Sequence, residues 1–319
     1  MKQKYIHIAL MPVLACLWSA CDREAASESM PDAHALQVRS VELPESSASR
    51  ALGATQLNEI GVYATNNDHS ALVANAKSIY RLQSGTWSSD TPPDIITTTN
   101  ADYLYAFSPA ALAVTNDGGG NHTVPVSIVA DNFTASRQAD YLYADRLEAL
   151  ATSRAVTFTM NHALAKVSFR VLKSDNVQET VTLKSIELLS STSRLQSGTN
   201  ATMNLNSGIL NGLVATSSIV LSGSAVLNTI QNQPNVSALV APMSAKETRL
   251  SFRLTVSVTE AGATSTERSF ETATVSEVQW KAGYHYVYAI TVDKMGGSLT
   301  NVKIDAWKND ANQNTGIGI

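Results

Sequence analysis

Short runs in which apolar and polar residues alternate recur along the chain from residue 51 onward. Such a run has a period of two, so it places one apolar face inward and one polar face outward, as a half-buried β-strand does. The clearest runs are 60–64, 124–128, 156–160, 166–171, 249–256 and 284–292. Their spacing of roughly 8 to 12 residues, with Gly, Asn, Asp and Pro between them, predicts an all-β protein built from β-sandwiches.

The segments between these runs add detail to this prediction. Residues 116–121 and 260–263 are rich in turn-forming residues and are predicted to be hairpin connections. Helical periodicity is scarce, and only 139–153 and 228–233 could hold a short helix. The hexapeptide Ala-Asp-Tyr-Leu-Tyr-Ala occurs at 101–106 and again at the start of 139–153. A single hexapeptide that occurs twice is too little evidence for a repeat protein. The repeated hexapeptide instead predicts two similar strands with their aromatic residues on one face.

The N-terminus has the features of an export signal. Lys2 and Lys4 precede an apolar stretch at 6–17, which has the length of a signal-peptide core and is too short to span a bilayer. Small residues then directly precede Cys21, and this order predicts a lipoprotein signal in which Cys21 is acylated. Cys16 fits the pattern about as well, although the arm that follows Cys21 is polar from its first residue. A secreted protein without lipid is the remaining alternative.

Composition excludes several classes of protein. The only cysteines are Cys16 and Cys21, so the mature chain would have no internal disulfide and no thiolate metal site. The formal net charge of -4 gives no basic patch for nucleic acid. No later run approaches 18 apolar residues, so the lipid would be the one membrane attachment. A chain of 319 residues supports about two domains.

Motifs for catalysis or cofactor binding are absent from the sequence. His69, His122, His162 and His285 each lack a second histidine three or four residues away, so no metal site and no cofactor are expected. The glycines at 118–120 are not followed by Lys-Ser or Lys-Thr, and no Gly-x-Ser-x-Gly motif occurs. His162 is expected to be structural. The sequence therefore predicts a protein that is not an enzyme; a hydrolase would need two acidic residues facing each other in a cleft.

Composition also divides the chain. We place a lipoprotein signal peptide at 1–21 and a flexible arm at 22–50, which is rich in Ala, Ser, Glu and Pro. The arm contains one apolar cluster at 35–43 that predicts a single strand. The N-terminal β-sandwich is expected at 51–153 and the C-terminal β-sandwich at 154–319.

Several motifs, taken in order, resemble landmarks of the fimbrillin family. They lie at 50–52, 59–63, 140–144, 158–169, 280–288 and 302–307. The resemblance implies two transthyretin-like β-sandwich domains in tandem. It further implies a surface-exposed lipoprotein precursor in the outer membrane, whose arm is cut after an arginine so that subunits assemble into fimbriae by strand donation. The implied partners are other fimbrial subunits, of the same or a paralogous chain, and surface ligands of a host or of other bacteria.

The same resemblance points to particular residues. Arg50 follows a run of small polar residues and is the expected cleavage site, whereas Arg39 lies inside the predicted strand of the arm. Ile304, Ile317 and Ile319 are the expected donor-strand residues. The last two would fill the pockets that the strand of the arm leaves after cleavage. Whether the chain is a stalk, tip or anchor subunit is left open by the sequence.

A monomeric outer-membrane lipoprotein that binds glycans is the alternative from another class. Trp87, Trp280 and Trp307 could stack on sugar rings, as aromatic residues of glycan-binding modules do. An aromatic content of 6% is low for that role, however. Trp280 and Trp307 also flank predicted strands, which fits a place in the core.

Overall fold

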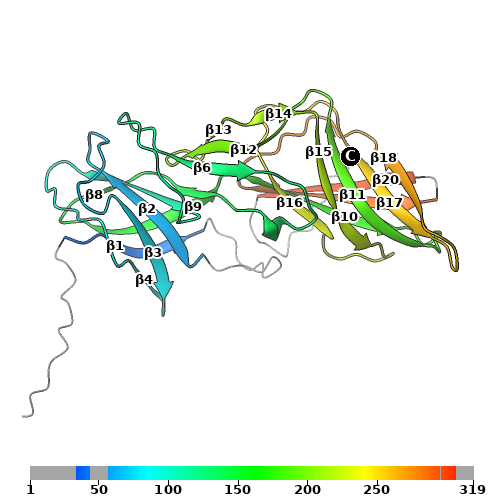
Figure 1. Cartoon of the computed structure of the whole chain (residues 1–319), viewed down its shortest axis with the longest axis horizontal. Coiled ribbons are helices and arrows are strands. Elements are labelled where there is room, and N and C mark those ends of the chain that lie inside the picture. Colours follow the sequence, from blue (N-terminus) through cyan, green and yellow to red (C-terminus); the bar gives the residue numbers. More distant parts are fainter. Residues whose placement is uncertain (1–33, 44–56, 295, 307–319) are drawn as a thin grey trace, which may run out of the picture. The chain divides into compact units, whose positions relative to one another are not determined.

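The structure, a computed structural model, describes residues 34–43, 57–294 and 296–306, the last range by its backbone (Figure 1). These residues form twenty β-strands and one short 3-10 helix, η1 (Ala135–Arg137). The all-β class predicted from the alternating runs is confirmed. Each of the six clearest runs lies within or largely within a strand.

The first sheet contains the strand of the arm. Its strands, in their order across the sheet, are β1 (Gln37–Glu42), β9 (Ala155–His162), β7 (Leu142–Ala144), β5 (Asp102–Ser108), β2 (Glu59–Thr65), β3 (Lys77–Gln83) and β4 (Thr86–Ser88), with β8 (Leu147–Ala149) also paired to β5. β1 at one end of this order also contacts β4 at the other end, so the sheet is nearly closed (Figure 1). Its inward side chains form one core cluster, which includes Ile60, Leu104 and Phe158.

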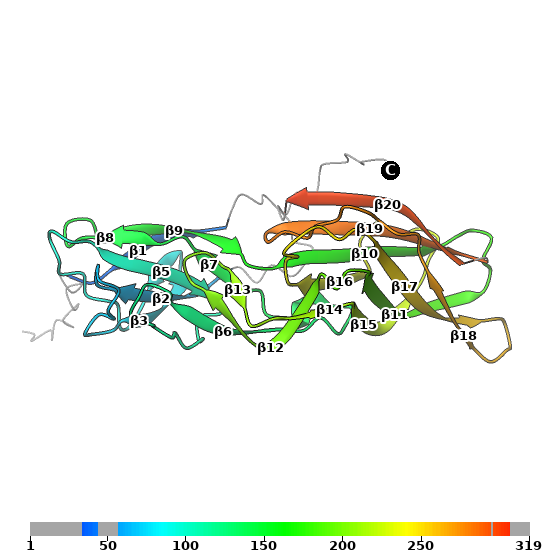
Figure 2. The same ribbon diagram turned by 90° about the horizontal axis from the view of Figure 1, so that it is seen from above.

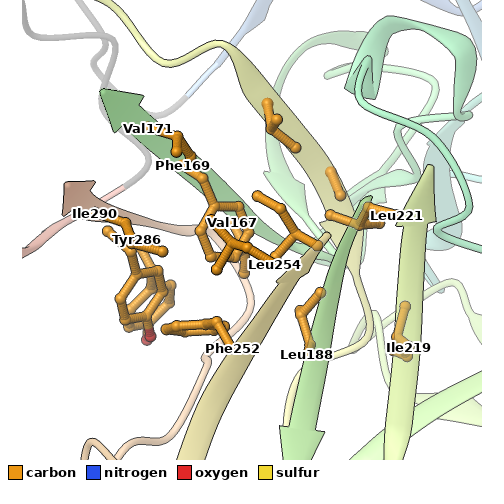
Figure 3. Packing of buried hydrophobic residues seen from close by; sticks show 14 of the residues in the cluster. Val167, Phe169, Val171, Leu188, Ile219, Leu221, Phe252, Leu254, Tyr286 and Ile290 are labelled. Atoms are coloured by element: carbon orange, nitrogen blue, oxygen red, sulfur yellow. The ribbon is translucent and has the colours of Figure 1, made fainter. Parts of the chain in front are cut away.

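Two four-stranded sheets enclose a second core. One has the order β16 (Val236–Val240), β10 (Ala165–Lys173), β19 (Tyr284–Asp293), β20 (Gly296–Ala306), and Figure 2 shows its last three strands side by side. The other has the order β15 (Ser218–Val226), β11 (Thr180–Ser190), β17 (Leu250–Thr259), β18 (Thr266–Glu271). Phe169 and Phe252 come from the two sheets and pack edge to face, with ring centroids 4.9 Å apart (Figure 3). This pairing of inward faces is that of a β-sandwich.

A further sheet joins strands that are distant in sequence. It consists of β13 (Leu210–Asn211), β12 (Leu195–Asn204), β14 (Val214–Thr216) and β6 (Thr123–Ile128). β12 pairs with β6 from Gly198 opposite Ile128 to Asn204 opposite Thr123. A third core cluster includes residues of β2, β5, β6, β12 and β16. The division into two domains near residue 153 stays a prediction. The pairing of β6, which precedes residue 153, with β12, which follows it, crosses that boundary.

The segment 130–138, which connects β6 to β7, runs along the outermost strand β15. Ser222 of β15 donates its N–H to the carbonyl oxygen of Asp131 at 2.9 Å. At Gly223 the strand has no side chain, and the ring of Phe133 occupies the place where a Cβ would lie. Glycine is therefore required here by the close approach of Phe133.

The same segment covers β16, the outermost strand of the other sheet. Ser237 donates its N–H to the carbonyl oxygen of Phe133 at 2.9 Å. The side-chain amide of Gln138 also hydrogen-bonds to the backbone of β16, as a neighbouring strand would. Its Oε1 accepts the N–H of Leu239 at 2.7 Å, and its Nε2 donates to the carbonyl oxygen of Leu239 at 2.7 Å.

The connections confirm some expectations and correct one. The segment 116–121 links Thr115 to Thr123, which exchange two backbone hydrogen bonds, and 260–263 links β17 to β18, so both predicted hairpins are present. The expectation of a short helix at 139–153 or 228–233 is wrong. Residues 142–144 and 147–149 are strands β7 and β8, because pairing with β5 and β9 outweighs the helical propensity of the Ala and Leu residues there.

Candidate functional site

The segment 35–42, which contains β1, places apolar side chains in the core of the first sheet. Ala35, Leu36 and Val38 are buried, with Leu36 only 3% and Val38 only 5% exposed. Both belong to the core cluster that includes Ile95 and Phe158. A strand in the arm is thus confirmed, and its inward residues complete the core of the sheet that follows it in sequence. That this strand is removable stays a prediction.

Hydrogen bonds hold this strand from both sides. On one side β1 pairs in parallel with β9, beginning with the N–H of Gln37 donated to the carbonyl oxygen of Arg154 at 3.0 Å. On the other side Leu36 donates its N–H to the carbonyl oxygen of Pro93 at 2.9 Å. Ile95 donates its N–H back to the carbonyl oxygen of His34 at 2.8 Å. The segment is therefore hydrogen-bonded to β9 along β1 and to residues 93–95 just before β1.

A buried tyrosine adds one more contact to this strand. The hydroxyl of Tyr80, which is 1% exposed, donates to the carbonyl oxygen of Leu36 at 2.8 Å. Burial raises the pKa of Tyr80, so the hydroxyl keeps its proton and remains a donor. The groove thus recognises the backbone of the strand as well as its side chains.

The pairing of β1 with β9 contains a bulge. Val38 lies opposite Val156 and Ser40 opposite Thr157, so Arg39 has no partner in β9. The Ser40 and Thr157 hydroxyls are 2.9 Å apart and hydrogen-bonded. The side chain of Arg39 is exposed, and its backbone lies within the strand, as the sequence predicted. A protease that needs an extended, unpaired backbone would not reach it here.

Losing β1 would be costly for the first sheet. Exposing a buried Leu or Val side chain costs about 1.5–3 kcal/mol. Each buried N–H or C=O group left without a partner costs about 1–3 kcal/mol more. Ile95, Pro93 and Arg154 would all lose a backbone partner of this kind. An emptied groove would consequently bind another strand of suitable shape.

A cleft of about 330 Å³ lies where β1 ends, lined among others by Leu43, Leu57, Asp140 and His162. Nδ1 of His162 lies 2.9 Å from a carboxylate oxygen of Asp140. Burial lowers the pKa of the neighbouring Lys166 to about 8, although Asp140 acts in the opposite direction. The contact with Asp140 agrees with the structural role expected for His162.

The other predicted site residues are placed as follows. Cys21, Arg50, Ile317 and Ile319 lie outside the described residues. Ile304 lies in β20, with its backbone opposite Tyr286 of β19. Residues up to Ala306 thus form a strand of this chain's own sandwich, and the donor assignment stays a prediction.

Neither described tryptophan is available for stacking on a sugar. Trp87 is 8% exposed, and Trp280 is fully buried with its Nε1 donating to the Tyr288 hydroxyl at 3.0 Å. Trp307 lies outside the described residues. Within the described ranges, no cluster of three or more metal-ligating side chains occurs, and no helix has the length and hydropathy to cross a membrane.

One buried charged residue, Glu247, was not predicted from the sequence. The carboxylate of Glu247 is fully buried and accepts hydrogen bonds from the hydroxyls of Ser190, Ser191 and Thr192 and from the N–H of Arg249. Burial raises its pKa, but these donors outweigh burial and bring the pKa to about 2. The three hydroxyl donors lie 55 to 57 residues before Glu247 in the chain, so local spacing gives no signal of this contact.

The comparisons with known proteins agree with this architecture. The family described as fimbrillin-like matches residues 49–307. A fimbrial protein from Bacteroides vulgatus has a TM-score of 0.58 at 10% identity, over 86% of this chain and 99% of its own. A candidate cell adhesion protein from Bacteroides ovatus has a TM-score of 0.56 at 16% identity, over 86% of this chain and 98% of its own.

A candidate cell adhesion protein from Bacteroides uniformis has a TM-score of 0.50 at 20% identity, over 86% of this chain and 100% of its own. At these identities the likeness establishes the fold alone. A search of curated proteins found no match. The family match spans most of the chain, so the chain belongs to the fimbrillin-like family of structural and adhesive surface proteins, which are not enzymes.

Proposed function

We propose that this protein is a subunit of surface fimbriae that assembles by strand donation after proteolysis of a lipoprotein precursor. The observation that carries the proposal is the segment 34–42 of the arm, which buries Leu36 and Val38 in the core. Its strand β1 pairs with β9, and residues 34–36 just before β1 are hydrogen-bonded to 93–95. A strand held in this way can be exchanged for an equivalent strand of another subunit. The family match supports the fimbrial part of the proposal.

Proteolysis after Arg50 would make β1 exchangeable. Arg50 lies between the end of β1 at Glu42 and the start of β2 at Glu59. Before cleavage the covalent link keeps β1 at a high effective concentration beside its groove. After cleavage only noncovalent contacts hold it, and a strand from another subunit competes on equal terms.

The C-terminal segment is the proposed donor. Ile317 and Ile319 are two residues apart, as Leu36 and Val38 are, so both pairs present two apolar side chains to the same face of a strand. The proposed partner is therefore another copy of this chain or a paralogous subunit. We further propose that the fold comprises two tandem transthyretin-like β-sandwiches, and that surface ligands of host or bacterial cells bind to the assembled fibre.

The cleavage step is tested on intact cells. Mass spectrometry of the surface protein should find chains that begin at Ala51, and Arg50→Ala should abolish both these chains and the multimers. Arg39→Ala, which changes an arginine within β1, is the matched control and should leave both unchanged. Multimers of normal length from Arg50→Ala protein would refute processing at this site.

The donor step is tested by truncation. Deleting residues 308–319 should leave a folded protein at the cell surface that no longer forms stable multimers. Replacing Ile317 and Ile319 together by Ser should have the same effect, since polar side chains do not fill apolar pockets. Unchanged polymerisation of both variants would rule out the donor assignment.

The lipid anchor is proposed to be on Cys21 and to attach the precursor to the outer membrane. Cys21→Ala should release the precursor from membranes, because the acyl chains provide the anchoring energy. Cys16→Ala is the matched control. If Cys16→Ala releases the protein and Cys21→Ala does not, Cys16 is the acylated residue.

A further inference from the structure

Two histidines from separate turns meet on the first sheet. His69 lies in the turn after β2, and His122 directly precedes β6. The centroids of their rings are 6.0 Å apart. Neither position has a second histidine nearby in sequence, so only the fold brings these two rings together.

Tyrosine rings form the floor beneath both imidazoles. Tyr63 of β2 lies opposite Tyr105 of β5, so both point to the same face of the sheet. The ring of His122 packs edge-on against them, at centroid distances of 5.3 and 4.8 Å. His69 lies over Tyr103 at 5.1 Å. The aromatic floor fixes the position of each imidazole.

The ring nitrogens of this pair are buried without hydrogen-bond partners in the described part of the protein. They are Nδ1 and Nε2 of His122, which is 1% exposed, and Nδ1 of His69. A buried nitrogen that makes no hydrogen bond costs free energy, so its presence calls for a physical reason. Burial, and next the nearby His69, lower the pKa of His122, while Asp117 acts in the opposite direction.

The backbone of His69 is held in an unfavourable conformation. Its φ of 67° lies in the left-handed region, which is uncommon for residues other than glycine. Asn116 stabilises this conformation, because its Nδ2 donates to the carbonyl oxygen of His69 at 3.0 Å. Asn116 belongs to the 116–121 turn that leads to His122. Strain of this kind tends to be found at functional sites.

The spacing of the two rings suits a shared metal ion. A metal–nitrogen bond of about 2.0–2.1 Å places two imidazoles on one ion with their centroids about 5–6 Å apart. Asp68 and Asp117 stand in the two turns and add negative charge, although each carboxylate already accepts backbone N–H groups. These charges favour a cation between the turns.

We propose that His69 and His122 bind one late first-row divalent metal ion, with Zn²⁺ and Cu²⁺ as the chemical class. Imidazole nitrogens are preferred ligands of these ions. Because the described residues hold no third His, Cys, Asp or Glu in ligating position, water or a tyrosine hydroxyl would complete the coordination. The affinity is expected to be lower than that of a closed structural zinc site. The ion would tie the 66–70 turn to the 116–121 turn.

Metal titration of the full-length protein tests this proposal. After treatment with EDTA, the protein should bind one Zn²⁺ per chain, and saturation should raise the Tm by about 2–4 °C. Cu²⁺ bound to the same protein should show two coordinated nitrogens by electron paramagnetic resonance. Both signals should be lost in His69→Gln and His122→Gln, whereas His34→Gln, which changes an exposed histidine of the arm, should retain them.

Two results would overturn the proposal. One is wild-type protein that binds neither ion, and the other is binding that is unchanged in His69→Gln and His122→Gln. If His122→Gln fails to fold because this position is buried, His69→Gln decides, since His69 is only partly buried and lies in a turn. The nitrogen count from wild-type protein is independent of either variant.

Discussion

Leu36 should control how readily β1 leaves its groove. Its side chain is 3% exposed in the core cluster of the first sheet, so Leu36→Ala removes buried apolar volume and leaves a cavity. Such substitutions cost about 2–5 kcal/mol, and at the end of a strand the lower part of that range, about 2–3 kcal/mol, is expected. A change of this size corresponds to about 30- to 150-fold in an equilibrium constant.

The direction of the effect on assembly depends on whether Leu36 is still part of the subunit in the polymer. After strand exchange β1 is no longer part of the subunit, so Leu36→Ala destabilises the precursor and leaves the polymer unchanged. Arm-cleaved protein carrying this substitution should therefore form multimers faster and at lower concentration than wild type. Size-exclusion chromatography over time measures both quantities, and near-ultraviolet circular dichroism checks that the subunit is folded.

Gln37→Ala is the matched control, because Gln37 directly follows Leu36 as the first residue of β1 and is exposed. It should polymerise like wild type. If Leu36→Ala lowers the stability of the cleaved subunit as expected and yet polymerises no faster than Gln37→Ala, release of β1 does not limit assembly. The strand-exchange argument would then be wrong.

Three further predictions concern stability, each measured by urea unfolding. Glu247→Gln should lower the free energy of unfolding by about 2 kcal/mol at neutral pH, because hydrogen bonds to a charged carboxylate are stronger than those to a neutral amide. The pKa of Glu247 is about 2 in the folded protein and ordinarily 4.5, so wild type should lose its extra stability over the variant as the pH falls from 4.5 toward 2. A difference in unfolding free energy between the two proteins that does not change with pH would contradict this prediction. Gln138→Ala should cost about 1–3 kcal/mol by removing both hydrogen bonds to Leu239, and an unchanged midpoint would show that solvent replaces them. Gly223→Ala should cost about 1–3 kcal/mol by overlap with Phe133, and Phe133→Leu should partly restore the loss; a variant as stable as wild type would contradict the close contact.

The alternating pattern predicted strands well where one face of the strand is buried. The runs at 124–128 and 156–160 became β6 and β9, with Val156, Phe158 and Met160 all pointing into one core. Each of these strands carries its pattern in its own residues, so periodicity is sufficient to find it. The strand of the arm was found in the same way.

Pairing between distant strands could not be predicted in this way. Residues 139–153 read as a possible helix because Ala and Leu favour one locally, whereas the actual partners of β7 are β5 and β9. The contact between His69 and His122, and the donors around Glu247, likewise depend on which turns the fold brings together. A periodic pattern specifies which face of a strand is buried and contains no information on its neighbour.

Outermost β-strands expose unpaired N–H and C=O groups, and another chain can pair with them and initiate aggregation. The segment 130–138 occupies such groups on β15 and β16, through backbone bonds from Asp131 and Phe133 and the amide of Gln138. A fibre concentrates many identical sheets within a small volume, where unintended pairing is most favoured. By covering these two strands, 130–138 would direct intermolecular pairing away from them, so that crowded subunits stay individually folded.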